Sequence, residues 1–123
     1  MRRLALIGIV VLAGCVTPSI PIPPPDPGRM TFDITGDAGN TKASFTYPAD
    51  VNYVGATVFV FNRDRGIGII DTARDDGSVG PTAPVAAAVG EQIVVTFEHG
   101  DQTVSTCVRL RQGQQSSTDY CGP

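Results

Sequence analysis

Three cysteines carry the most distinctive chemistry in this chain of 123 residues. Cys15 follows an apolar N-terminal segment, whereas Cys107 and Cys121 both lie near the C-terminus. In an oxidising compartment such a pair is expected to form a disulfide, which would draw residues 112–119 back against the last strand. A bridge closing a loop of this size contributes about 3 kcal/mol in the chain-entropy treatment. Zinc is the weaker alternative, because the two cysteines and the distant His99 supply at most three ligands.

Acidic side chains and the one histidine offer little for catalysis. Asp75 and Asp76 are adjacent, with Asp71 shortly before them, and such carboxylates could bind calcium weakly. No EF-hand spacing is present, and aspartates beside Gly77 are more typical of a turn in which they accept backbone hydrogen bonds. His99 falls in an expected hairpin turn, and no G-x-S-x-G nucleophile elbow occurs. We therefore expect no catalytic residues, no metal, no cofactor and no enzymatic activity.

Composition narrows the class of protein further. Nine basic and twelve acidic side chains give a net charge of −3, so the basic footprint of a nucleic-acid-binding protein is missing. Apolar residues make up 41% and charged residues 17%, which argues against a disordered chain. Fourteen glycines and ten prolines favour many turns and short strands over long helices. The length leaves room for one domain.

The N-terminal residues have the layout of an export signal. Arg2 and Arg3 form a basic start, and residues 4–13 (LALIGIVVLA) are an unbroken apolar run. A helix needs about 20 apolar residues to span a bilayer, so this run is too short for a permanent anchor. A short basic region, a brief apolar region and small residues at its end describe a secretory signal peptide, here residues 1–14.

The end of that signal, Leu12-Ala13-Gly14-Cys15, resembles the lipobox of bacterial lipoproteins. The resemblance implies that Cys15 receives a thioether-linked diacylglycerol, becomes the new N-terminus and is acylated on its amine. Several acyl chains anchor a protein stably, whereas one chain holds it only marginally. Val16 follows in place of the aspartate associated with inner-membrane retention, which implies an outer-membrane destination in the cell envelope. The lipid on Cys15 thus makes the membrane an expected partner. The sequence leaves open whether the domain lies on the periplasmic or the surface side of that membrane.

Residues 15–29 are expected to be the lipidated cysteine and a Pro-rich tether. Residues 16–29 hold six of the ten prolines and should be extended polyproline II, spanning about 40 Å at 3.1 Å per residue. A Pro-rich ligand for a groove-type partner is the alternative. Removal of residues 1–14 would leave seven basic and twelve acidic side chains, a charge that anionic headgroups repel.

From Met30 onward the apolar residues alternate with polar ones, the period of half-buried strands. Turns rich in Gly and Asp separate these runs, which predicts an all-β domain over residues 30–123 built as an antiparallel sandwich. Residues 85–89 (VAAAV) could instead form a helical turn, confined by Pro84 and Gly90. The expected strands are 30–35, 42–47, 56–61, 67–72, 91–98 and 103–111.

A second resemblance rests on the residues 55–62 (GATVFVFN), 76–78 (DGS), 89–95 (VGEQIVV) and 100–101 (GD). Their order is similar to the pattern of bacterial immunoglobulin-like repeats and carboxypeptidase-regulatory-like domains. It implies a Greek-key β-sandwich of about seven strands over roughly half of the chain. Phe59 and Phe61 depart from that pattern, because the family usually has Thr there. They place two aromatic rings on a face that is normally wet, so we expect the C-terminal tail or a partner to cover them.

These features together predict a lipid-anchored envelope protein with a non-catalytic immunoglobulin-like module. The module would be structural or adhesive, or would bind an envelope protein or a polysaccharide. One alternative is a periplasmic inhibitor of a lysozyme or a protease, for which small lipidated β-domains with one disulfide are a precedent. Another is an accessory subunit of an envelope complex, with Phe59 and Phe61 as its apolar contact strip.

Overall fold

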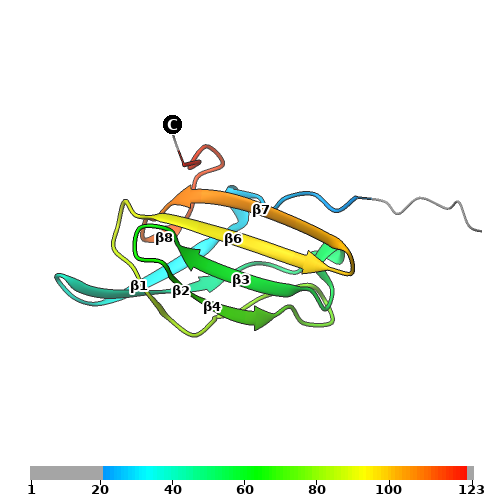
Figure 1. Ribbon diagram of the computed structural model, residues 1–123, viewed down its shortest axis with the longest axis horizontal. Coiled ribbons are helices and arrows are strands. Elements are labelled where there is room, and N and C mark those ends of the chain that lie inside the picture. Colours follow the sequence, from blue (N-terminus) through cyan, green and yellow to red (C-terminus); the bar gives the residue numbers. More distant parts are fainter. Residues whose placement is uncertain (1–20, 122–123) are drawn as a thin grey trace, which may run out of the picture.

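Strand formation follows the alternation of apolar residues, and the chain folds into two β-sheets packed face to face (Figure 1). The computed structural model describes residues 21–121. One sheet has the strand order β5-β2-β1-β8 and the other the order β4-β3-β6-β7. In chain order the strands are β1 Thr31–Asp37, β2 Asn40–Thr46, β3 Thr57–Asn62, β4 Ile67–Thr72, β5 Val85–Ala86, β6 Gln92–His99, β7 Gln102–Arg109 and β8 Gly113–Gln114; two short 3₁₀ helices are η1 Pro27–Arg29 and η2 Val51–Tyr53.

Every strand pair is antiparallel. The hairpins β1-β2, β3-β4 and β6-β7 are joined by connections that cross between the sheets, and β6 returns to lie beside β3. Such crossings are the Greek-key connections of β-sandwiches. The predicted all-β antiparallel sandwich is therefore confirmed, with eight strands where about seven were expected.

Aromatic rings fill one half of the core between the sheets. Tyr53 stacks on Phe97 with a centroid distance of 4.1 Å, and Tyr47 meets the same two rings edge-on at 5.7 and 5.5 Å. Phe45 continues the cluster toward Phe32 on β1. Because each ring buries a large apolar area, this cluster supplies much of the hydrophobic stabilisation. Burial raises the pKa of both Tyr47 and Tyr53, so their hydroxyls remain protonated donors or acceptors.

The Pro-rich segment differs from expectation, because residues 22–29 pack against the domain. Pro25 and Pro27 are buried, and Ile22 contacts the hydrophobic core. The Tyr53 hydroxyl donates a 2.5 Å hydrogen bond to the Pro23 carbonyl, and the Tyr47 hydroxyl accepts one of 3.1 Å from the Asp26 amide. We call residues 22–29 the strap. The strap is therefore packed on the sandwich, since buried tyrosine hydroxyls need partners that the strap's backbone provides.

Two further elements differ from the sequence-based expectations. The possible helical turn at residues 85–89 is wrong, because Val85 and Ala86 form the short strand β5 beside β2. Thr41 fixes this segment by donating its hydroxyl to the Ala87 carbonyl at 2.5 Å. The tail residues expected to form a loop contribute β8, which pairs with β1. Beyond it, Gln115 is 2% exposed and donates to the Arg109 carbonyl at 2.8 Å.

The signal peptide (residues 1–14) and Cys15 lie outside the described residues. Across residues 21–121, no helix has the length and apolar character needed to cross a bilayer.

Candidate functional site

The outer face of the β4-β3-β6-β7 sheet carries the apolar residues singled out in the sequence. Alternation along β3 sends Val58, Val60 and Asn62 into the core, which turns Phe59 and Phe61 outward. Phe59 lies opposite Ile70 of β4, and together they line a shallow hollow of about 590 Å³. Phe61 and Ile70 are 41% and 69% exposed. We call the outward residues Phe59, Phe61, Ile70 and Val94 the apolar face.

Phe61 also has a structural role on this face. It pairs with Gly68, where an added Cβ would lie 2.6 Å from the Val60 carbonyl oxygen and 3.2 Å from the Phe61 ring. The ring therefore covers the bare backbone of the glycine, an arrangement known to stabilise glycine in strands. Phe59 has no such glycine opposite it, because its cross-strand neighbours are Ile70 and Thr96.

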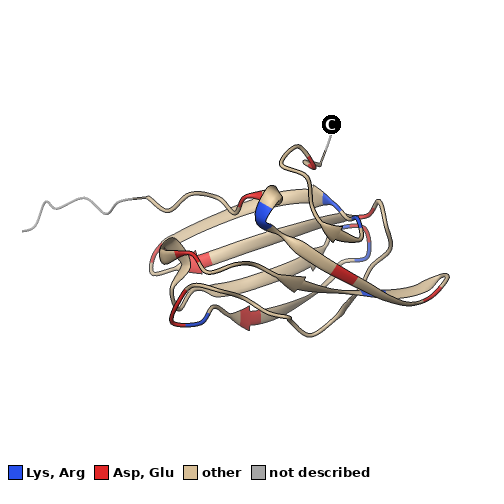
Figure 2. Ribbon diagram, turned by 180° about the vertical axis from the view of Figure 1, so that it is seen from behind, with Lys and Arg blue, Asp and Glu red and all other residues tan. Residues whose placement is uncertain are grey.

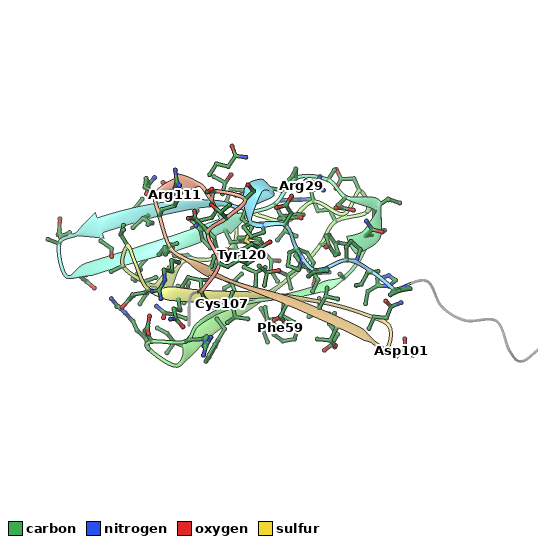
Figure 3. All side chains as sticks on the ribbon, turned by 90° about the horizontal axis from the view of Figure 1, so that it is seen from above. Arg29, Phe59, Asp101, Cys107, Arg111 and Tyr120 are labelled. Atoms are coloured by element: carbon green, nitrogen blue, oxygen red, sulfur yellow. A yellow bond between two sulfur atoms is a disulfide. The ribbon has the colours of Figure 1, made fainter. Side chains whose placement is uncertain are left out.

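The C-terminal tail does not cover the apolar face within the described part of the chain. Tyr120 forms a bridge to Val108, and the Cys121 amide donates to the Cys107 carbonyl at 2.9 Å, so this segment follows β7. Figure 3 labels Tyr120, Cys107 and Phe59 in the middle part of the molecule, seen from above. No residue of the tail lines the hollow. Within residues 21–121, the expected cover of Phe59 and Phe61 by the tail is therefore not found.

The predicted cysteine pair lies at disulfide distance. Cys107 and Cys121 are bonded, with their Cα atoms 5.3 Å apart. Cys107 points away from the core, whereas its neighbours Thr106 and Val108 are buried, as the alternation along the strand predicts. The bridge lies beside a second hollow of about 420 Å³, which the strap lines with Pro24 and Pro25. The disulfide thus fastens the tail to the edge strand β7.

The two edge strands of this sheet, β7 and β4, are protected by different contacts. Along β7, the Thr106 hydroxyl donates to the Pro25 carbonyl at 2.6 Å, and the Cys121 amide donates to the Cys107 carbonyl at 2.9 Å. Along β4, the Asp71 carboxylate accepts the neighbouring Thr72 amide at 2.7 Å. This amide points away from β3, because the next one, that of Ala73, bonds to Ala56. Asp71 therefore occupies a donor that an added strand would need.

Arginines gather at the end of the sandwich away from the strap (Figure 2). Two of them, Arg65 and Arg111, bond to Glu91 at 3.0 Å and to Asp119 at 3.5 Å. Arg63 instead places its Nη1 3.6 Å from the Sγ of Cys107.

Arg109 lies two residues beyond Cys107 on the same outward side of β7, opposite Gln92. The Arg63 amide donates to the Gln92 carbonyl at 2.9 Å, so Arg63 and Arg109 flank the same strand end. In the described chain, neither guanidinium is within ion-pair distance of a carboxylate. Within residues 21–121, two cations thus border the apolar face without an ion-pair partner.

The acidic cluster has the turn chemistry that its spacing favours. Asp76 accepts the Ser78 hydroxyl at 2.6 Å and the Ser78 amide at 2.9 Å, and these hydrogen bonds lower the pKa of its carboxyl. Asp71 bonds locally to Thr72. His99 is exposed at the end of β6. Among the described residues, no three His, Cys, Asp or Glu side chains are grouped to hold a metal ion.

A buried polar network at the arginine-rich end has no signal in the sequence. Asn62 is fully buried and donates its side-chain amide to the Ala86 carbonyl at 3.0 Å and to Glu91 at 3.1 Å. Glu91 also accepts the Ala88 amide at 2.6 Å and the Arg65 guanidinium at 3.0 Å. Burial raises the pKa of the Glu91 carboxyl, but these hydrogen bonds outweigh it and leave the pKa lowered. The network fixes the loop on which Arg63 is presented.

Comparison with family models, with curated proteins and with solved structures finds no match for this chain.

Proposed function

We propose that this protein is a non-catalytic, lipid-anchored module of the bacterial cell envelope that binds another envelope protein through the apolar face. The observation that carries the proposal is the exposure of Phe61 and Ile70 beside Phe59, where no described segment of the chain lies over them. Apolar patches rimmed by polar residues are typical of protein-protein contact sites. An antiparallel sheet face that only met water would be expected to carry polar side chains here.

The anchor rests on the lipobox at Leu12–Cys15 and the signal peptide before it. Its test is the intact mass of the protein extracted from host membranes, with and without reductant. We expect a chain that begins at Cys15, carries acyl groups and gains two protons when the disulfide is reduced. A full-length chain without acyl groups would remove the anchor from the proposal and leave the binding module to be judged separately.

The binding face is tested by photo-crosslinking in cells at native expression, with a benzophenone amino acid at position 70. Ile70 is a suitable site because its side chain is 69% exposed on the apolar face. We expect one discrete protein adduct, which the double variant Phe59→Thr/Phe61→Thr abolishes while the domain stays folded by circular dichroism. The matched control places the probe at Lys42, an exposed position of the other sheet. The same adduct from both positions, or none from position 70, would contradict the proposal.

A further inference from the structure

Arg63 and Arg109 lie beside the apolar face and indicate the chemistry of the partner. This inference rests on the proposed binding function. We infer that the partner presents an acidic protein segment that carries both carboxylates and bulky apolar side chains. The apolar side chains would pack on Phe59, Phe61 and Ile70, and the carboxylates would pair with Arg63 and Arg109.

Charge complementarity is the first argument. The mature chain would have twelve acidic and seven basic side chains, so most of its surface repels an acidic partner. Of the seven basic residues, Arg29, Arg65 and Arg111 are in ion pairs, and Arg74 donates to the Gly80 carbonyl at 2.7 Å.

Among the described residues, neither Arg63 nor Arg109 has a carboxylate or a carbonyl oxygen as the partner of its guanidinium. Both lie on the outer face that carries the apolar residues. An exposed guanidinium offers up to five donors in a fork that matches a carboxylate. Among the described residues, Lys42 on the other sheet is the third cation without such a partner, so two of the three available cations lie where the apolar side chains are exposed. A segment with acidic and apolar side chains would complement both the two arginines and the apolar face.

The mode of contact follows from the edges of the sheet. Addition of the segment as a strand beside β7 is blocked by the strap and the tail, which bond to Thr106 and Cys107. Addition beside β4 would have to displace Asp71 from the Thr72 amide. The segment is therefore expected to lie across the sheet face and be held by side chains, which makes the charge pairs decisive for recognition.

The test uses the chain with Cys15→Ser and two fluorescent ten-residue peptides, one composed of Leu and Glu and one with Lys at each position of Glu. By fluorescence anisotropy we expect the Glu peptide to bind about tenfold more tightly, the size of a pair of rim charge contacts. Arg63→Glu and Arg109→Glu should each remove most of that preference, and the double variant should favour the Lys peptide. Lys42→Glu, an equal charge change on the other sheet, should leave the preference unchanged.

Equal binding of the two peptides, or binding of neither, would overturn the inference. Flotation with phosphatidylcholine vesicles containing phosphatidylglycerol tests the competing anionic source. Vesicle binding that Arg63→Glu and Arg109→Glu abolish would assign the face to lipid headgroups and overturn an acidic protein segment. The crosslinked adduct from position 70 separates the two proposals: if it persists in both arginine variants, the binding function stands and the charge inference fails.

Discussion

The Thr106 hydroxyl on β7 donates a 2.6 Å hydrogen bond to the backbone carbonyl of Pro25 in the strap. This bond joins residues 81 positions apart in the sequence. Thr106 is 7% exposed, and the Pro25 carbonyl is the partner of its hydroxyl. A segment with the composition of a linker is in this way part of the folded domain.

Replacement of Thr106 by valine should destabilise the domain by about 1–3 kcal/mol, because it leaves the Pro25 carbonyl without its donor. The change keeps the shape of the side chain and removes only the hydroxyl. Urea unfolding of the two proteins measures the difference. Thr103→Val, on the exposed side of the same strand, is the control and should change the free energy of unfolding by less than about 0.5 kcal/mol. Equal effects of the two changes would deny the strap its structural role.

Cleavage of the disulfide should lower the free energy of unfolding by about 3 kcal/mol, the chain-entropy value for a loop closed over 14 residues. The variant Cys107→Ser/Cys121→Ser should unfold at the same urea concentration with and without reductant, whereas the parent chain should shift. A parent chain that is insensitive to reductant would show that β8 and Gln115 hold the tail unaided.

Alanine substitutions at Gly77 and Gly90 distinguish the cost of backbone strain from the cost of steric collision. Gly77 and Gly90 both have positive φ, 81° and 92°, so alanine at either position should cost about 1–2 kcal/mol from strain. A Cβ at Gly77 would also lie 1.7 Å from the Asp50 carbonyl oxygen, whereas a Cβ at Gly90 has nothing within 4 Å. We therefore expect Gly77→Ala to cost about 3 kcal/mol or more, because strain and overpacking add. Thermal unfolding of the two variants checks the order.

Acid should weaken the Asn62–Glu91 network. The folded-state pKa of Glu91 is lowered from its ordinary value of 4.5, so its contribution to stability is fully present above about pH 5. That contribution is lost as the pH falls through the lowered folded-state pKa. The variant Glu91→Gln should therefore be less stable than the parent at pH 7 and approach it at pH 3. Urea titrations at the two pH values provide the measurement, and a constant difference between the proteins would contradict the assignment.

The sequence predicts the long strands well because each carries its own periodic signal. Ile93, Val95 and Phe97 recur at every second position of β6, and all three are fully buried. The short strand β5 has no such signal, since Val85 and Ala86 become a strand only through pairing with β2. Long-range partners decide what local composition leaves open.

Long-range contacts also explain why the sequence predicts neither the burial of Gln115 nor the docking of the strap. Gln115 is polar and lies in a polar stretch, and its burial depends on the Arg109 carbonyl and the Arg111 amide, which only the fold brings to it. The strap is rich in proline and reads as a spacer, because nothing in its composition points to the hydroxyls of Tyr53 and Thr106. For the candidate site, alternation places Phe59 and Phe61 outward. That Arg63 and Arg109 lie beside them follows only from the strand register.

The docking of the strap has a mechanical consequence. Its contacts with Gln102, Tyr53, Thr106 and Tyr47 follow one another along the strap in that order, beginning with the 2.7 Å bond from the Ile22 amide. Tension applied ahead of Ile22 would load these bonds one at a time, as in unzipping, and leave the strand ladders unloaded. Released residues 22–29 would extend the reach of the domain by about 25 Å at 3.1 Å per residue. The strap can thus yield to a pulling force before either sheet does.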